Sequence, residues 1–383
     1  MRKLAIISTH PIQYNAPLFK LLNQRGNITI KVFYTWGSQV IEGKYDPGFD
    51  KNIEWDIPLL DGYEYEWVEN NSKDPGSHHF KGIDNPGLIA LIESWKADAV
   101  LVYGWSFKSH LKVMRYFKEK IPVFFRGDSV LLNKNSRLKA LLRQLFLKWV
   151  YSYIDVALYV GTHNRAYYKS FGVKDSQLVF APHAIDNSRF SETAPIKTAA
   201  LVWRSSLGIE PQDIVFLYAG KLDKNKNTRI LASVFVELDT SHTHLLIAGS
   251  GICKESLKKS FGNHTNVHFL PFQNQSLMPD VYAMANVFVL PSIAETWGLS
   301  INEAMASEKP VLVSDTCGAA IDLVQNGVNG FIFRSGDEKD LKDKMRKLLD
   351  SAADLQKMGN ASLEIIKKWN YEMDCNAIES LSS

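Results

Sequence analysis

The sequence predicts an α/β fold in which two Rossmann-like domains, each built on a doubly wound parallel sheet, face each other across a cleft. Three observations lead to this prediction. Short runs of consecutive apolar residues recur along the 383-residue chain, and stretches of helical length separate them. Apolar residues in succession are typical of parallel strands buried on both faces. A polar stretch at 188–206 divides the runs into two series, and each series predicts one sheet.

The two series contain the predicted strands in chain order. In the first series the apolar runs lie at 4–8, 28–34, 99–103, 123–126, 156–160 and 178–181. In the second series they lie at 214–219, 244–248, 267–270, 287–290 and 311–314. Stretches of helical length in the second series include 280–285, 297–307 and 340–349.

The two series define two predicted domains, the first at residues 1–190 and the second at residues 206–364. Residues 37–86 break the rhythm of strands and helices because they are rich in Gly, Asp, Asn and aromatic residues. We interpret them as an irregular insertion in the first domain, of the kind that forms binding loops.

Composition and charge exclude several classes of protein. The 44 basic and 41 acidic residues give a net charge of +3, which predicts no binding to nucleic acid. Cys253, Cys317 and Cys375 lie far apart, so a disulfide scaffold and a zinc ribbon are excluded and a reducing compartment fits. The apolar run near Met1 is too short for a signal peptide, and no run reaches the roughly 18 residues of a membrane span. We therefore expect a cytoplasmic protein.

A glycine and three lysines follow the first strand of the second series. Gly220 permits a tight turn, and Lys221, Lys224 and Lys226 precede the next helix. Ligands of open parallel sheets bind beyond the carboxyl ends of the strands. A helix amino terminus beside lysines is suited to a phosphate or diphosphate, and a solvated basic loop is the alternative interpretation.

Two carboxylates flank the start of another predicted helix in the second series. Glu295 follows strand 287–290, Gly298 allows close backbone approach, and Glu303 lies about one turn into a helix that begins near Leu299. Two carboxylates around a helix amino terminus suit a ligand with a central diphosphate and a polyol at each end. Alternatively, Glu295 is a helix cap and Glu303 a surface residue.

Glu295 and Glu303 resemble the Glu-x7-Glu motif of the retaining GT-B glycosyltransferases of family four. Residues 220–227 are similar to that family's Gly-Arg-x4-Lys-Gly phosphate motif, with Lys221 in place of Arg and Asn227 in place of the last Gly. Residues 311–315, 318 and 327–331 match its second domain. Residues 9–14 and 17–19 resemble a subgroup that works in bacterial polysaccharide and surface-glycan assembly.

The resemblance implies a nucleotide sugar as donor. Lys221 and Lys226 would hold its diphosphate, and Lys221 would do so without the bidentate geometry of arginine. Glu303 would bind the ribose hydroxyls, and Glu295 would bind the 3-hydroxyl region of the transferred sugar. The other donor-binding residues implied are Gly220, Asn227, Phe272 beside the base, Gly298, and Leu299 and Ser300 through their backbone N–H groups.

The family also places a histidine after a strand of the first domain, near the 6-hydroxyl of the sugar. This chain has Asp128 in that region, and we expect Asp128 to make the contact, with Arg126 as the alternative. Arg126 and Asp128 could also simply pair with each other. His10, Gln13 and Tyr14 follow the first strand, and we expect them, together with Arg126, on the acceptor side.

The mechanism implied is a retaining transfer of a hexose-type sugar, in which the leaving diphosphate assists attack from the same face. A UDP-sugar is favoured by family frequency, GDP stays open, and the acceptor is a glycan or a lipid-linked molecule. The chain has no Asp-x-Asp, and His78–His79 comes with no Cys or carboxylate at ligand spacing, so we expect no metal and no other cofactor. The carboxyl-terminal helix, 365–383, would cross back to the first domain.

Two other functions share parts of this pattern. A non-hydrolysing sugar-nucleotide epimerase would use the same architecture and donor without an acceptor. A non-catalytic nucleotide-sugar-binding partner subunit is the second alternative.

Residues 134–150 combine five basic residues with leucines at helical spacing and no acid. The spacing favours leucines that face the core over leucines that face a membrane. The basic face could still contact anionic lipid, which would place the protein peripherally on the inner face of the membrane.

Overall fold

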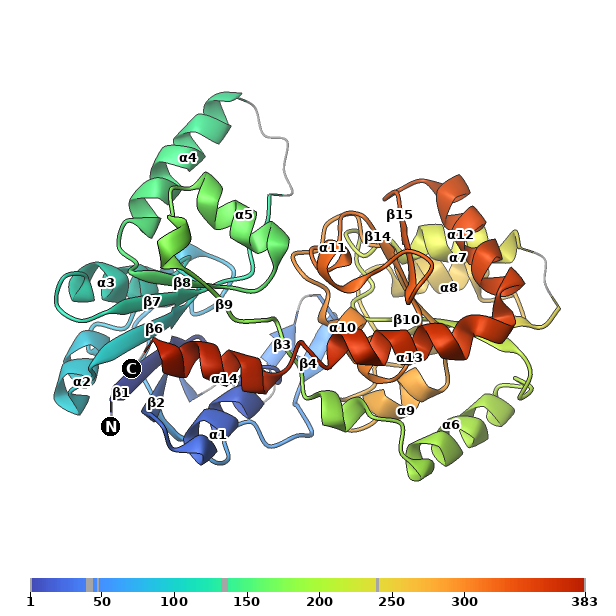
Figure 1. Cartoon of the computed structure of the whole chain (residues 1–383), viewed down its shortest axis with the longest axis horizontal. Coiled ribbons are helices and arrows are strands. Elements are labelled where there is room, and N and C mark those ends of the chain that lie inside the picture. Colours follow the sequence, from blue (N-terminus) through green and yellow to red (C-terminus); the bar gives the residue numbers. More distant parts are fainter. Residues whose placement is uncertain (1, 39–43, 47, 132–136, 239–240, 382–383) are drawn as a thin grey trace. The chain divides into compact units, whose positions relative to one another are not determined.

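The computed structural model describes residues 2–38, 44–46, 48–131, 137–238 and 241–381. They form two compact units, whose elements are labelled in Figure 1. The first unit consists of Met1–Lys44, Pro58–His183 and Tyr371–Ser383, and the second of Tyr45–Ile57 and Ala184–Asn370.

The first unit is built on a seven-stranded sheet in the order β5-β2-β1-β6-β7-β8-β9, and every neighbouring pair is parallel. In chain order its strands are β1 (Lys3–Ser8), β2 (Thr29–Tyr34), β5 (Glu64–Trp67), β6 (Ala99–Tyr103), β7 (Val123–Arg126), β8 (Val156–Tyr159) and β9 (Leu178–Phe180).

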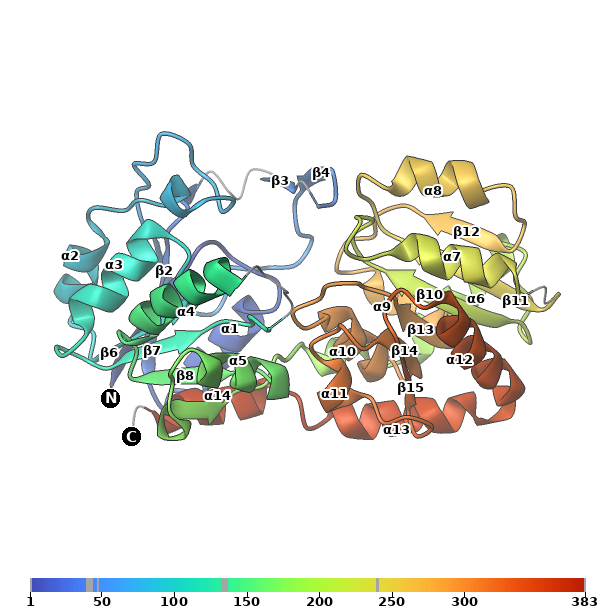
Figure 2. The same ribbon diagram turned by 90° about the horizontal axis from the view of Figure 1, so that it is seen from above.

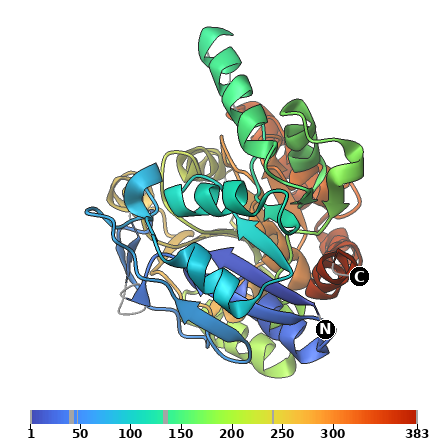
Figure 3. The same cartoon turned by 90° about the vertical axis from the view of Figure 1, so that its left-hand side faces the viewer.

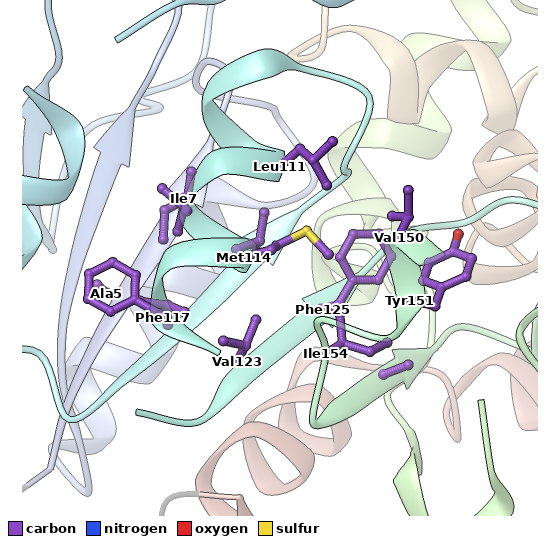
Figure 4. Packing of buried hydrophobic residues seen from close by; sticks show 14 of the residues in the cluster. Ala5, Ile7, Leu111, Met114, Phe117, Val123, Phe125, Val150, Tyr151 and Ile154 are labelled. Atoms are coloured by element: carbon purple, nitrogen blue, oxygen red, sulfur yellow. The ribbon is translucent and has the colours of Figure 1, made fainter. Parts of the chain in front are cut away.

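Both faces of this sheet are covered by helices. Alternate residues of β1 contribute to two hydrophobic clusters, Ala5 and Ile7 to one and Leu4 and Ile6 to the other. The first cluster is closed by α2 (Leu88–Trp95), α3 (Lys108–Phe117), α4 (Arg137–Tyr151) and α5 (Thr162–Ser170). Met114 of α3 packs there near Phe125 and Val150 (Figure 4). The second cluster is closed by α1 (Ala16–Arg25) and α14 (Tyr371–Ser380), which lie side by side (Figures 1 and 2).

The second unit is built on a six-stranded parallel sheet in the order β12-β11-β10-β13-β14-β15. In chain order its strands are β10 (Ile214–Ala219), β11 (Thr243–Ala248), β12 (Val267–Leu270), β13 (Val287–Leu290), β14 (Val311–Ser314) and β15 (Gly330–Phe333). Its helices are α6 (Ala194–Ser206), α7 (Thr228–Val236), α8 (Lys254–Phe261), α9 (Met278–Ala283), α10 (Leu299–Ala306), α11 (Ala320–Leu323), α12 (Glu338–Asp350) and α13 (Leu355–Ile366).

The predicted α/β class with two Rossmann-like parallel sheets is confirmed. All eleven predicted strands are present, with bounds that differ from the prediction by at most one residue. Within the two main sheets, strands β5 and β15 were not predicted. Strand β5, at the edge of the first sheet, has the sequence Glu-Tyr-Glu-Trp, in which charged and aromatic residues alternate, so it leaves no continuous apolar run. Its two glutamates pair with Lys31 on β2, at 3.1 and 2.8 Å.

The stretch 188–206 is not the simple polar divider that the sequence predicts, because most of it is helix α6. Two of its apolar residues, Leu201 and Val202, are exposed, so the helix lacks a clear apolar stripe. Its inward contact is made by Arg204, which donates to the carbonyl groups of Asp213 (2.6 Å) and Glu210 (3.0 Å).

The stretch 37–86, predicted as an irregular insertion in the first domain, is divided between the two units. Residues 39–43 and 47 lie outside the described residues. Strand β5 belongs to the sheet of the first unit, whereas Tyr45–Ile57 packs with the second unit. This segment includes β4 (Lys51–Ile53), which pairs with β3 (Lys44–Asp46) in a separate two-stranded sheet.

A buried histidine under the first sheet makes the stability of the fold depend on pH. The Nδ1 atom of His110 faces the carbonyl of Gly104 at 2.9 Å, and its Nε2 lies 2.9 Å from the hydroxyl of Thr35. Burial lowers the pKa of His110 to about 4. In the unfolded chain His110 takes up a proton near pH 6.5. The contribution of the neutral histidine to the free energy of unfolding is therefore complete above that pH and is lost as the pH falls toward 4.

Between pH 7.5 and pH 5, we expect the free energy of unfolding in urea to fall by about 2 kcal/mol less in His110→Gln than in the wild type. His264→Gln, a change at an exposed histidine, is the matched control and should behave as the wild type. An equal loss in all three proteins would show that His110 does not titrate in this way.

Candidate functional site

The second sheet has a topological switch point between β10 and β13. The chain runs from β10 outward through β11 and β12, and then returns to β13 on the other side of β10. The loops after β10 and β13 therefore diverge at the carboxyl edge of the sheet, where open α/β sheets bind their ligands. These two loops carry Lys221, Lys226 and Glu295.

Hydrogen bonds from backbone N–H groups fix the conformation of the loop after β10. The N–H of Leu222 donates to the carbonyl of Ser250 at 2.8 Å, which ties this loop to the one after β11. The N–H of Lys226 donates to a carboxylate oxygen of Asp223 at 3.0 Å. Asn227 adopts the left-handed conformation (φ 51°) immediately before α7, a conformation that asparagine tolerates. The position of Lys226 thus follows from local hydrogen bonds.

The loop after β13 is held in place by backbone contacts with the loop after β14. Glu295 forms a β-bridge with Cys317, and the N–H of Gly318 donates to the carbonyl of Glu295 at 3.0 Å. A Cβ at Gly318 would lie 1.8 Å from the carbonyl oxygen of Thr296, so only glycine fits there. Burial raises the pKa of the Cys317 thiol to about 12, which keeps it neutral beside this loop.

Lys226 and Glu295 form an ion pair that joins these two loops across the switch point. The Lys226 and Glu295 side chains are 22% and 13% exposed. This exposure places the pair at the surface of the unit rather than in its core. The structure therefore brings together two residues that lie 69 positions apart in the chain.

Helix α10 begins beside Glu295 and carries Glu303. Gly298 is its amino-terminal cap in the left-handed conformation (φ 98°), and Leu299 and Ser300 are its first two residues, whose N–H groups have no partner within the helix. Glu303 is buried, and the hydroxyl of Tyr282 on α9 donates to its carboxylate at 2.7 Å. Glu303 is thus not the exposed helix residue of the alternative interpretation.

The remaining residues predicted to bind the donor lie in neighbouring loops of the same unit. Lys221 and Phe272 are half-buried and contact Phe49, which belongs to the segment Tyr45–Ile57. Gly220 adopts a positive φ of 152° at the end of β10, as the predicted tight turn requires.

The residues predicted near the acceptor lie in the first unit, on loops after β1 and β7. His10, Gln13 and Tyr14 are half-buried. The His10 ring packs edge-on against Trp36 at 5.3 Å, and its Nδ1 lies 2.8 Å from the hydroxyl of Thr9. Asp128 lies in the loop after β7.

A histidine that sequence analysis missed lies near Asp128. His183 follows β9 after two residues. Burial lowers its pKa to about 4, and the negative charge of Asp128 opposes this lowering. The signal was available, because only Pro182 separates His183 from the predicted strand 178–181, at the edge of the sheet where ligands bind. His183 is therefore an additional candidate in the first unit.

Arg126 does not fit the acceptor-side role that was predicted for it. Its guanidinium pairs with Asp374 of α14 at 2.9 Å, and both side chains are buried. It also donates to the carbonyl groups of Ala181 (3.2 Å) and Pro182 (2.8 Å). A buried arginine held by three such partners favours a structural role, in which it attaches α14 to the first sheet.

Helix α4, which contains most of the predicted basic segment 134–150, exposes apolar side chains. Residues 134–136 of this segment lie outside the described residues. Figure 3 shows the helix, coloured green, extending from the first unit. The leucines were expected to face the core, but five large apolar side chains are exposed: Leu141, Leu142, Leu145, Phe146 and Trp149. Among the side chains of the helix that the structure describes, Leu147, Val150 and Tyr151 are buried and belong to the hydrophobic cluster on the sheet.

His78 and His79 do have a carboxylate partner, contrary to the sequence analysis. The Asp74 carboxylate lies 3.5 Å from Nε2 of His78 and 3.2 Å from Nε2 of His79. Asp74 precedes His78 by four residues, and a turn of the loop brings it back to the histidine pair.

The second unit is similar in sequence to known glycosyl transferases. Residues 201–364 match the family of glycosyl transferases group 1. The sulfoquinovosyl transferase SQD2 of Arabidopsis thaliana is 33% identical over 165 residues, which are 42% of this chain and 32% of that protein. The chain spans between about a third and just over half of the length of the first curated relatives it matches.

Solved glycosyltransferase structures share the fold over the whole chain. Sucrose-phosphate synthase from Thermosynechococcus elongatus superposes with a TM-score of 0.75 at 17% identity, covering 100% of this chain and 98% of that one. HepE of Anabaena, solved in complex with UDP, gives a TM-score of 0.73 at 15% identity and covers both chains completely. The two Rossmann-like units of this chain are thus those of the GT-B fold.

Proposed function

We propose that this chain is a retaining glycosyltransferase of family four. It transfers a hexose-type sugar from a nucleotide sugar, with a UDP-sugar favoured, to a glycan or lipid-linked acceptor. The observation that carries the proposal is the Lys226–Glu295 pair at the switch point beside the first turn of α10. The match of residues 201–364 to glycosyl transferases group 1 and the UDP complex of HepE support it.

The diphosphate of the donor replaces Glu295 as the partner of Lys226. Lys226 and Lys221 then lie where negative charge grows as the glycosidic bond breaks, and the N–H groups of Leu299 and Ser300 point to the same place. Glu295, released from the ion pair, accepts hydrogen bonds from hydroxyls of the transferred sugar. Glu303, held by Tyr282, accepts those of the ribose.

The leaving diphosphate accepts the proton of the attacking hydroxyl, which enters from the same face. The lysines and the helix N–H groups supply the positive charge that a divalent cation supplies in other transferases, so we propose that transfer is independent of metal. In the first unit, Asp128 contacts the sugar, and His10, Gln13 and Tyr14 face the acceptor.

Exposed apolar residues of α4 suit contact with a membrane surface. Leu142 is 59% exposed and Trp149 is 40% exposed, and the basic residues Arg143 and Lys148 lie on the same helix, also exposed. Apolar side chains that enter the interface, together with cations that pair with anionic headgroups, are the features of peripheral helices. Among the described residues, no helix is long and apolar enough to cross a membrane. We propose that α4 attaches the protein peripherally to the inner face of the membrane, near a lipid-linked acceptor.

We expect UDP at 100 times its Kd to add about 2.7 kcal/mol to the free energy of unfolding and so to raise the melting temperature of the protein. Because the proposed transfer is independent of metal, the increase should be the same with and without EDTA. Lys226→Ala should weaken UDP binding at least tenfold and lower turnover about 100-fold or more. Lys224→Ala, at an exposed lysine of the same loop, is the matched control and should change both by less than threefold.

No stabilisation by any nucleotide, or equal behaviour of the two lysine variants, would contradict the proposed donor site. Product analysis separates the alternatives. An altered sugar nucleotide formed without acceptor would indicate an epimerase, and binding without turnover would indicate a partner subunit.

For the membrane contact, we expect the protein to sediment with vesicles that contain phosphatidylglycerol and to be released by high salt. Leu145→Glu with Phe146→Glu should abolish sedimentation. Leu201→Glu with Val202→Glu, at exposed apolar residues of α6, is the matched control. Absence of wild-type sedimentation, or loss in both double variants, would overturn this part of the proposal.

A further inference from the structure

A short segment that lies in sequence between strands of the first sheet packs on the candidate donor site. Residues 48–57, which we term the arm, come between β2 and β5 of the first unit, yet they belong to the second unit. Nothing in the sequence pattern requires this, because chain neighbours on both sides of the arm return to the first sheet.

The tip of the arm touches the loops after three adjacent strands, β10, β11 and β12. A Cβ at Gly48 would lie 2.6 to 2.9 Å from side-chain atoms of Lys221, so the glycine is in close contact with that lysine. A Cβ at Gly251, in the loop after β11, would lie 2.8 Å from the carbonyl oxygen of Gly48. The ring of Phe49 meets Phe272, after β12, edge to face at 5.1 Å.

Polar contacts farther along the arm hold it in place. The side-chain amide of Asn274 donates to the carbonyl of Glu54 at 2.7 Å, and the N–H of Ser276 donates to Asp56 at 3.1 Å. The ammonium of Lys51 lies 4.5 Å from the centre of the Phe272 ring. The arm is therefore seated by hydrogen bonds and a cation–π contact, in addition to the contacts of its tip.

Phe49 connects the two ends of the predicted nucleotide site. Its ring contacts Phe272, the residue predicted beside the base, and the ammonium of Lys221, predicted at the diphosphate, lies 5.0 Å from the centre of the same ring. A nucleotide that spans these two residues lies against the arm. Aromatic rings in that position stack on nucleobases with little regard to base identity.

We propose that the arm is a wall of the donor site, and that Phe49 is a donor-binding residue that packs on the nucleoside half of the nucleotide sugar. This inference rests on the proposed function, since it takes Lys221 and Phe272 as donor-binding residues. It adds a residue from the amino-terminal half of the sequence to a site whose other proposed donor-binding residues lie within the matched range 201–364.

The test compares the affinities of UMP and UDP for the wild type and four variants. Phe49→Ala should weaken both nucleotides equally, by about fivefold or more, because it acts on the nucleoside that they share. Lys226→Ala should weaken UDP more than UMP. Phe49→Tyr should restore most of the affinity, and Phe80→Ala, at an exposed aromatic residue of the stretch 37–86, is the matched control.

Unchanged affinity in Phe49→Ala would overturn the role of the arm, and tighter binding would show that the arm obstructs the site instead. Both results leave the proposed function intact if Lys226→Ala still weakens UDP. Failure of the wild type to bind any nucleotide would overturn the proposed function as well.

A separate observation concerns the loop that carries Asp74, His78 and His79 in the first unit. The three ligand-type atoms all lie within 4.8 Å of one another. Ligand atoms about 2.0–2.1 Å from a tetrahedral zinc ion lie roughly 3.3 Å apart. The two Asp74–His separations of 3.5 and 3.2 Å match the edges of such a tetrahedron.

Backbone hydrogen bonds define this loop before any ion binds. The N–H of Gly76 donates to the carbonyl of Gly82 at 3.0 Å, and the N–H of Gly82 donates to the carbonyl of His79 at 3.1 Å. The hydroxyl of Ser72 donates to the carbonyl of Lys81 at 2.7 Å. The loop thereby returns on itself and brings Asp74 beside the histidine pair.

We infer that Asp74, His78 and His79 bind a divalent transition-metal ion, zinc by ligand type and geometry, with water in the fourth position. The site lies on a loop of the first unit, and the transfer proposed above uses none of its three residues. Its occupancy is thus compatible with transfer that is insensitive to EDTA.

The test is titration of metal-free protein with Co²⁺, whose tetrahedral complexes absorb visible light, followed by displacement with Zn²⁺. We expect one equivalent to bind, and His78→Asn with His79→Asn to abolish the absorption. His163→Asn, at an exposed histidine of the same unit, should leave it unchanged. An equal signal from the double variant, or none from the wild type, would overturn this site.

Discussion

The ion pair between Lys226 and Glu295 depends on the strand order of the second sheet and in turn organises the candidate site. It forms because β10 and β13 are neighbours, although two strands lie between them in the chain. Each partner is positioned by its own loop, Lys226 through Asp223 and Glu295 through the bridge to Cys317. An ion pair that is partly exposed costs little to open, so an anionic ligand can take the place of the carboxylate.

A second ion pair, between Arg126 and Asp374, has the opposite character. Both side chains are buried, and the pair joins β7 to the last helix of the chain. Loss of one partner would leave the other charged and buried, which is far more costly than the loss of an exposed pair. The chain thus uses the exposed pair where a ligand is expected and the buried pair where an element must stay attached.

Much of the fold could be predicted because residues buried on both faces of a sheet leave continuous apolar runs. Strand β5 was not predicted because its charged and aromatic residues alternate, and α6 was not predicted because Leu201 and Val202 are exposed. The places of Lys226 and Glu295 after strand ends could be predicted from the apolar runs, whereas their roles in a donor site stay predictions. The arm and the partner of Arg126 could not be predicted, because each depends on a contact between residues far apart in the sequence. Asp74 lies only four residues before His78, so the pattern Asp-x3-His-His was available in the sequence and was overlooked.

The exposed apolar face of α4 shows the same limit. Helical spacing of leucines predicts an amphipathic helix, but it does not tell which environment the apolar face meets. Only the packing of Leu147 and Val150 against the sheet shows that the other apolar residues point elsewhere.

The central claim is that a nucleoside diphosphate displaces Glu295 from Lys226 at the switch point. A crystal structure of the protein with UDP tests this most directly. The account predicts diphosphate oxygens within hydrogen-bond distance of the Lys226 ammonium and of the N–H groups of Leu299 and Ser300, with the Lys226–Glu295 pair opened. UDP bound elsewhere, or bound with that pair intact, would contradict it.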